Sequence, residues 1–188
     1  CDNKPGVVQK AMVVCSKREI GYALLQKFRK LQSDWFKERK APEDYVVPEK
    51  EMKKLVPMPT IAMVATRGKN DVKDMYDYLG DKKRTKALEN AFKQEYSNFR
   101  IVIVVDMWIT GFDVPCLTYL YNDKPLQKHT LVQTVSRVNR KYPGKDFGYI
   151  IDYIGIRNNM MEAMKKYGGE TFGPSEDDVE ERRVGKEC

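Results

Sequence analysis

The sequence has little of the chemistry that metal centres, disulfides and histidine-based catalysis require. Among its 188 residues there is one histidine, His129, which excludes any site built from a histidine cluster. The four cysteines, Cys1, Cys15, Cys116 and Cys188, show no CxxC or CxxH spacing. Cys15 and Cys116 lie in apolar stretches, where a cysteine is usually a buried, reduced thiol. We therefore expect neither a zinc site nor a disulfide.

Signals for membrane insertion and secretion are also missing. No apolar run approaches the roughly 18 residues that a membrane-spanning helix needs, and the N-terminus does not resemble a signal peptide. These absences predict a cytoplasmic protein without membrane contact. The chain begins with a cysteine and ends in a charged run, so we expect it to be a piece of something longer.

The charge of the chain is basic and unevenly distributed. The formal net charge is +7, yet residues 170–188 hold seven acidic and three basic side chains, so the remainder carries +11. A basic body favours a polyanionic partner, because binding releases condensed counterions. We expect one domain over residues 1–168, and over residues 169–188 an acidic tail, disordered or a linker to a further domain.

Continuous apolar runs alternate with helical patterns along the chain. A buried strand is predicted over residues 10–16, and further strands over 60–66, 101–106, 117–123 and 147–152. Helices are predicted over 16–39, 71–79, 84–96, 131–140 and around a methionine stripe at 160–167. The string SKRE is interpreted as a capping box with Ser16 as the N-cap. Strands that are apolar throughout indicate an α/β fold with a mainly parallel sheet and helices on both faces, where ligands gather at the carboxyl ends of the strands.

The helix predicted over residues 131–140 has two distinct sides. At about 100° per residue, its apolar residues fall on one side and its amide and two arginines on the other; these are Leu131, Val135 and Val138, against Gln133, Arg137 and Arg140. A guanidinium offers a fork of donors that suits phosphate oxygens. The pattern favours an anion site, although a solvated basic helix face would look the same.

The turn TGFDVP, residues 110–115, is the second candidate for chemistry. Gly111 permits unusual backbone conformations and close approach of a ligand, and Asp113 could accept hydrogen bonds from a ribose. The alternative is a tight turn in which Asp113 caps a neighbouring group. Since the chain has no GxxxxGK[ST] loop and no strand that ends in an acidic pair, it could supply only half of a nucleotide site.

These motifs, in this order, resemble the second motor lobe of superfamily 2 helicases and translocases. AMVVCS (11–16), TGFDVP (110–115) and QTVSRVNR (133–140) are similar to its motifs IV, V and VI. Within the superfamily the chain most resembles the motor (R) subunit of type I restriction endonucleases. The strings that carry this likeness are IVVDMWITGFDVP, YNDKPLQKH, LVQTVSRVNR and GKDFGYIIDY.

The resemblance implies a fold, a cofactor and a set of roles. The fold would be a RecA-like three-layer sandwich, and ATP with Mg would bind between this lobe and an absent first lobe. Arg140 would be the arginine finger, with Arg137 beside it, and Gln133 would order their face. Gly111 and Asp113 would border the nucleotide. The DNA backbone would be contacted by strand-end residues, namely Ser16, Lys17, Thr66 and Arg67.

The same resemblance implies partners and leaves alternatives open. The whole protein would be a bacterial or archaeal, ATP-dependent endonuclease subunit that acts on double-stranded DNA with methyltransferase and specificity subunits, and the fragment alone would be inactive. Val105 and Thr110 depart from the Thr and Arg that many superfamily members carry there. Trp108 is either a stacking residue or a buried aromatic. The alternatives are a helicase lobe acting on DNA or RNA, and a non-catalytic α/β interaction module.

Overall fold

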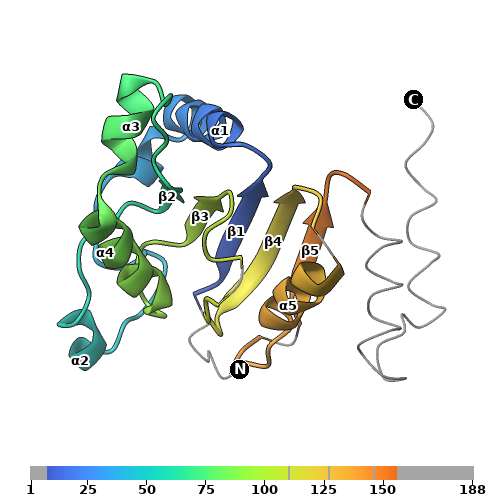
Figure 1. The fold of residues 1–188 in the computed structure, drawn as a ribbon. Helices are drawn as coiled ribbons and strands as arrows, with labels where there is room; N and C mark the ends of the chain where they lie inside the picture. The colour runs from blue at the N-terminus through green and yellow to red at the C-terminus, as the bar shows by residue number, and fades with distance from the viewer. Residues whose placement is uncertain (1–7, 110, 127, 146, 156–188) are drawn as a thin grey trace, which may run out of the picture.

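A computed structural model describes residues 8–109, 111–126, 128–145 and 147–155. Five parallel strands form a sheet in the order β2-β3-β1-β4-β5 (Figure 1). Their carboxyl ends all lie at the same end of the sheet. The strands are β1 (Lys10–Cys15), β2 (Ile61–Val64), β3 (Ile101–Val104), β4 (Leu117–Asp123) and β5 (Tyr149–Asp152). The helices are α1 (Arg18–Leu31), the 3-10 turn η1 (Ser33–Phe36), α2 (Glu49–Met52), α3 (Lys73–Leu79), α4 (Lys82–Lys93) and α5 (Lys128–Val138).

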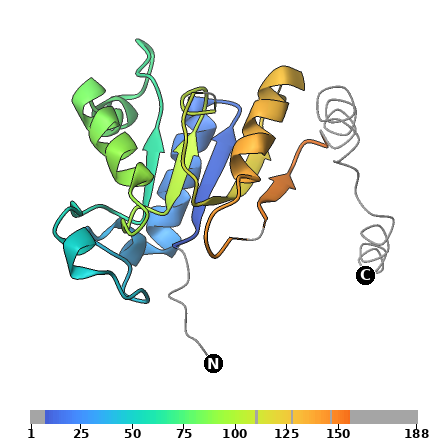
Figure 2. The same cartoon turned by 90° about the horizontal axis from the view of Figure 1, so that it is seen from below.

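Helices cover both faces of the sheet, because alternate residues of the strands point to opposite sides. One face packs against α4 and α5, and its core includes Val14, Val104, Phe92 and Val138. The other packs against α1 and α3 in a second core. Figures 1 and 2 show α1 and α5 on opposite sides of the strands. The expected fold class, a three-layer α/β sandwich with a parallel sheet, is confirmed.

Both ends of α1 and the exposure of β5 differ from their sequence predictions. The capping box is wrong, because the N-cap of α1 is Lys17, in extended conformation and with no side-chain cap, so Ser16 lies one residue too early. The helix ends at Leu31 because Gln32 leaves the helical conformation (φ −137°, ψ 61°). The β5 strand was expected as an apolar strand of a sheet covered on both faces, but it forms one edge of the sheet and Tyr149 is 45% exposed.

The chain between β3 and β4 crosses the α4/α5 face of the sheet. It leaves the carboxyl end of β3 and leads to the start of β4. There it lies beside the start of β1, where Lys10 N donates to the carbonyl oxygen of Cys116 at 3.3 Å. Trp108 adopts a left-handed backbone conformation (φ 66°). It is buried and stacks on Phe112, with ring centroids 4.3 Å apart. The interpretation of Trp108 as a buried aromatic is therefore confirmed, and the connection is anchored in the core.

The first residue of β1 is a fully buried lysine, which the sequence pattern did not predict. Lys10 Nζ donates to the carbonyl oxygens of Phe92 at 2.6 Å and Gln94 at 2.7 Å. These carbonyls lie at the C-terminal end of α4, where helix carbonyls lack partners within the helix. Burial lowers the pKa of Lys10 from 10.5 to about 8. The methionine stripe at 160–167 and the acidic tail lie outside the described residues.

Candidate functional site

The sequence-predicted site residues fall into two groups in the structure. One group surrounds the connection that crosses the α4/α5 face, and it comprises Gly111, Asp113, Gln133, Arg137 and Arg140. The other lies at the carboxyl ends of β1 and β2, and it comprises Ser16, Lys17, Thr66 and Arg67. The loops that carry Ser16, Thr66 and the glycine turn (residues 111–115) were expected at the carboxyl ends of the strands. The glycine turn departs from that expectation, because the connection runs down the sheet face to reach the start of β4.

Arg137 joins the last turn of α5 to the glycine turn. Its Nη1 donates a hydrogen bond to the carbonyl oxygen of Phe112, and its Nε is buried without a hydrogen-bond partner in the described part of the chain. The helix is held from behind by Leu131, Val135 and Val138, all buried as predicted. The guanidinium therefore has a fixed position with donor capacity to spare.

Arg140 reaches the same turn from outside the helix. The helix ends at Val138, two residues earlier than predicted, so Arg140 belongs to the segment that leaves it. Arg140 Nη1 forms an ion pair with Asp113 Oδ2, and the two side chains are 52% and 55% exposed. The hydrogen bond to Asp113 raises the pKa of Arg140, which keeps the guanidinium charged. A ligand in solvent could therefore reach both partners.

The glycine turn is held in place by aromatic packing. The ring of Phe112 stacks on Trp108 and also contacts the ammonium of Lys93, which is 5.1 Å from its centroid. Gly111 has φ 72°, and a Cβ there would meet nothing within 4 Å. Glycine is therefore favoured by the backbone conformation rather than by lack of space. Gln133 is exposed one turn before Arg137 on α5.

Sequence reasoning missed Lys124, which lies within the string DKPL. Its Nζ donates to the carbonyl oxygen of Val105 at 3.3 Å and forms an ion pair with Asp106. The side chain thus ties the end of β4 to the start of the connection after β3. A lysine directly after a buried strand was the available signal, but nothing in the sequence identified its partner.

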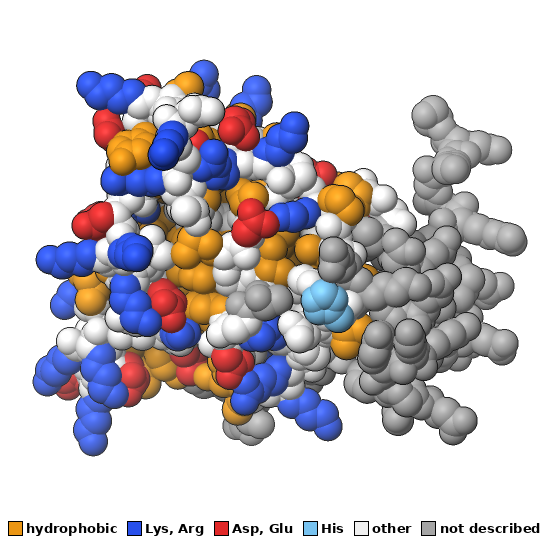
Figure 3. Space-filling model, in the orientation of Figure 1, with side chains coloured by type: hydrophobic (Ala, Val, Ile, Leu, Met, Phe, Trp, Pro, Cys, Tyr) orange, Lys and Arg blue, Asp and Glu red, His pale blue; other side chains and the backbone are white. Residues whose placement is uncertain are grey.

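The second group lies on two loops that contact each other. Lys17 and Thr66 are exposed, Ser16 is half-buried, and the Arg67 guanidinium stacks on the ring of Tyr76 at 4.3 Å. Arg18, which the sequence analysis did not select, donates from Nη1 to the carbonyl oxygen of Thr66 at 3.0 Å. Figure 3 shows many basic side chains on the part of the surface formed by α3 and α4. This basic surface of α3 and α4 suits a polyanion electrostatically.

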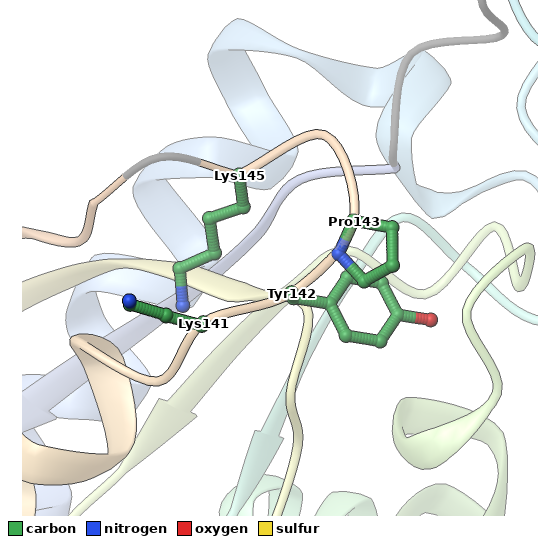
Figure 4. Close-up of a pocket in the computed structure, with 4 residues that line it drawn as sticks. All are labelled: Lys141, Tyr142, Pro143 and Lys145. Carbon is green, nitrogen blue, oxygen red and sulfur yellow. The ribbon is translucent and has the colours of Figure 1, made fainter.

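A hollow of about 390 Å³ lies beside the segment that follows α5. Figure 4 shows Lys141, Tyr142, Pro143 and Lys145 around it. The polar groups of two of these residues are already used within the protein. Lys145 Nζ donates to the carbonyl oxygen of Leu117 at 2.6 Å, and Tyr142 Oη donates to Glu95 Oε2 at 2.7 Å. Burial, with the hydrogen bond to Glu95, raises the pKa of Tyr142. The hollow is thus bordered by contacts that attach this segment to β4 and to the segment after α4.

Metal centres and membrane spans do not occur in the described part of the chain. Across the described residues, no group of three or more His, Cys, Asp and Glu side chains could hold a metal ion. None of the helices within the described ranges is long and apolar enough to cross a membrane. Cys15 and Cys116 are free and buried, as expected. Around the glycine turn, the described residues offer two guanidinium groups and the carboxylate of Asp113.

Comparison with known proteins gives matches among curated proteins and among solved structures. The chain is 43% identical over 113 residues to a protein of Methanocaldococcus jannaschii with the provisional name type I restriction enzyme MjaIXP endonuclease subunit, covering 60% of this chain and 11% of that protein. It is 32% identical over 168 residues to the type I restriction enzyme HindI endonuclease subunit of Haemophilus influenzae, covering 88% and 14%. Among solved structures, the type ISP restriction-modification enzyme LlaBIII bound to DNA matches with TM-score 0.41 and 21% identity, over 76% of this chain and 8% of that one.

The chain spans only 11% and 14% of the length of these two curated relatives. A family model described as type I restriction enzyme subunit R domain 3 matches residues 61–155, half of the sequence. The matched region contains the glycine turn and both arginines of α5 and its exit. The resemblance drawn from the sequence motifs is confirmed: this chain belongs to the family of domain 3 of the type I restriction enzyme R subunit.

Proposed function

We propose that this domain is the second motor lobe of an ATP-dependent DNA translocase within a type I restriction endonuclease. Arg140 is the arginine finger that stabilises charge on the γ-phosphate, and Arg137 binds beside it. Asp113 accepts a hydrogen bond from the ribose, Gly111 borders the nucleotide, and Gln133 orders the face that carries the arginines. The bound nucleotide is ATP with Mg.

One observation supports this proposal above the others. Two guanidinium groups from α5 and its exit meet the same turn, one at the carbonyl oxygen of Phe112 and one at the carboxylate of Asp113. A solvated basic helix face would spread its arginines into water. Arg140 and Asp113 remain half-exposed, so a nucleotide carried by a neighbouring lobe could replace their mutual contact.

The residues fit one half of an ATP site. The arginine fork suits phosphate oxygens, and Arg137 Nε still lacks a partner within the described part of the chain. Magnesium prefers carboxylate oxygens, water and substrate phosphates, and the described residues include no cluster of acidic side chains that would hold it. We infer that the phosphate loop and the magnesium ligands belong to a first lobe elsewhere in the whole protein, and that this fragment alone does not hydrolyse ATP.

Double-stranded DNA is the proposed polymer on which the motor moves. Ser16, Lys17, Thr66 and Arg67 would bind its phosphates, which are the same for every sequence, so this lobe would not read bases. Recognition and cleavage would then depend on other parts of the assembly, with a methyltransferase subunit, a specificity subunit and a nuclease domain. The proposed location is the cytoplasm of a bacterium or archaeon.

The decisive experiment replaces the proposed finger in the full-length protein. Arg140→Ala should lower DNA-stimulated ATP hydrolysis at least a hundredfold, a loss of about 3 kcal/mol of transition-state stabilisation. Lys141→Ala is the matched control, because it removes one exposed positive charge from the next position. The control should keep the wild-type rate.

Two results would contradict the proposal. An unchanged rate in Arg140→Ala would favour a non-catalytic α/β interaction module. Stronger stimulation of wild-type ATP hydrolysis by RNA than by duplex DNA would favour an RNA helicase lobe. Both are measured in the same phosphate-release assay.

A further inference from the structure

Arg18 joins the first turn of α1 to the loop that follows β2. Its Nη2 lies 2.9 Å from Asp71 Oδ1, and its Nη1 lies 3.3 Å from Asp71 Oδ2 and 3.0 Å from the carbonyl oxygen of Thr66. The side chain of Asp71 is completely buried, whereas that of Arg18 is 28% exposed. Solvent therefore screens this ion pair less than it screens pairs on the surface.

The guanidinium of Arg18 occupies the space that a side chain at position 68 would fill, and Gly68 has no side chain. The Gly68 N–H donates to Asp71 Oδ2 at 2.6 Å, and Asp71 N donates back to the carbonyl oxygen of Gly68 at 3.2 Å. A Cβ at position 68 would overlap the guanidinium of Arg18, 2.6 Å from its Cζ. The loop is thus closed around the arginine, and any larger residue at position 68 would push it out.

The contact spans two strands that are not neighbours. In the sheet β3 lies between β1 and β2, so the loops after β1 and β2 begin two strand positions apart. Figure 1 shows α1 and α3, which follow these loops, at the same edge of the sheet. Their contact is supported by the rings of Tyr22 and Tyr78, with centroids 5.9 Å apart. Arg18 therefore fixes the separation of two loops that the sheet alone would leave independent.

We propose that Arg18, Asp71 and Gly68 form a positioning clamp that sets the distance between two phosphate-binding loops. Lys17 directly precedes Arg18, and Thr66 and Arg67 directly precede Gly68. When both loops are held, they bind one DNA backbone at the same time, and the second interaction becomes effectively intramolecular. This inference rests on the proposed DNA contacts of the lobe.

Simple electrostatics and the clamp predict opposite effects for Asp71→Asn. Removing a negative charge near DNA should strengthen binding if only the net charge of the surface matters. The clamp predicts weaker binding, because the two loops separate. The affinity should fall about tenfold, and the slope of log affinity against log salt should become shallower by about 0.9 for each DNA phosphate that the protein no longer neutralises.

The experiment measures binding of duplex DNA to the full-length protein by fluorescence anisotropy over a series of salt concentrations. Gly68→Ala keeps every charge and should weaken binding as much as Asp71→Asn does. Arg18→Lys keeps the positive charge but removes the fork of donors, so it should also weaken binding, and Arg18→Lys with Gly68→Ala should be no worse than either alone. ATP hydrolysis without DNA should stay at the wild-type rate in all of them.

Asp34→Asn is the matched control, because Asp34 also pairs with an arginine, Arg39, but in the η1 region. It should not weaken DNA binding. Wild-type or tighter binding by Asp71→Asn, with weaker binding by Lys17→Ala, would refute the clamp and leave the DNA surface intact. If Lys17→Ala also binds DNA with wild-type affinity, the proposed DNA surface is wrong and the clamp proposal is refuted with it. Loss of DNA-free ATP hydrolysis in the clamp variants would indicate general damage and would equally refute the clamp.

Discussion

The buried Lys10 makes the stability of this domain depend on pH in a direction that the structure determines. Burial lowers its pKa from 10.5 to about 8 in the folded protein. In the unfolded chain the lysine regains its ordinary pKa, so between pH 8 and 10.5 the unfolded chain binds a proton that the folded one does not. The free energy of unfolding therefore rises with pH across this window, and this part of the stability is lost as the pH falls through 8.

The size of the effect follows from the two pKa values. The gap between about 8 and 10.5 corresponds to about 3.5 kcal/mol, at roughly 1.4 kcal/mol per pKa unit. From pH 7 to pH 9 the linkage relation gives a rise of about 1.3 kcal/mol. The neutral amine still has two N–H donors, enough for the carbonyl oxygens of Phe92 and Gln94, so deprotonation does not break these hydrogen bonds.

The assay compares the wild-type chain with Lys10→Met by urea unfolding at pH 7, 8 and 9. Methionine is also unbranched and carries no charge, so the variant should lose this part of the pH dependence. The range stops at pH 9 because burial raises the pKa values of Cys15, to about 11, and of Cys116. Above pH 9, ionisation of these thiols in the unfolded chain would destabilise both proteins. A stability difference that stays flat or falls from pH 7 to pH 9 would refute the reasoning.

Two further predictions concern packing: one on glycine substitutions and one on the reactivity of the buried cysteines. Gly148→Ala would place a methyl group 2.6 Å from the carbonyl carbon of Val138, the last residue of α5. It should lower the free energy of unfolding by at least about 3 kcal/mol, more than Gly155→Ala, where the positive φ alone costs about 1 kcal/mol. Cys15 and Cys116 should resist alkylation at pH 8 in the folded protein and react in guanidinium, as followed by peptide mass mapping, because burial raises both pKa values and blocks access.

The sequence was sufficient for the architecture because the strands are locally unambiguous. Runs such as IAMV and IVIV are buried on both faces, and only a covered parallel sheet accommodates them. Helix ends were less predictable. The extended conformation of Lys17 moved the start of α1, and Gln32 ended it early. These boundaries depend on single backbone conformations, which periodicity does not encode.

The composition of the candidate site was predictable, but its contacts were not. The spacing of Gln133 and Arg137 placed both on one side of a helix whose other side is buried. The partners of Arg18 and Lys124 are 53 and 18 positions away in the chain. Such pairs arise from the strand order, and without it the loops after β1 and β2 could not be placed next to each other. The burial of Lys10 has the same origin, because its acceptors lie at the end of α4.

The connection from residue 105 to residue 116 is fixed at both ends and in the middle. Lys124 holds its start through Asp106, Arg140 contacts Asp113 near its end, and the rings of Trp108 and Phe112 anchor it in the core between them. The same α5 segment supplies Arg137 to Phe112. A ligand that draws Arg140 away from Asp113 would therefore act on a segment already packed against the sheet. Because close-packed interiors have low compressibility and transmit strain, the effect would extend along the connection toward the end of β3, at the same end of the strands as the loops after β1 and β2.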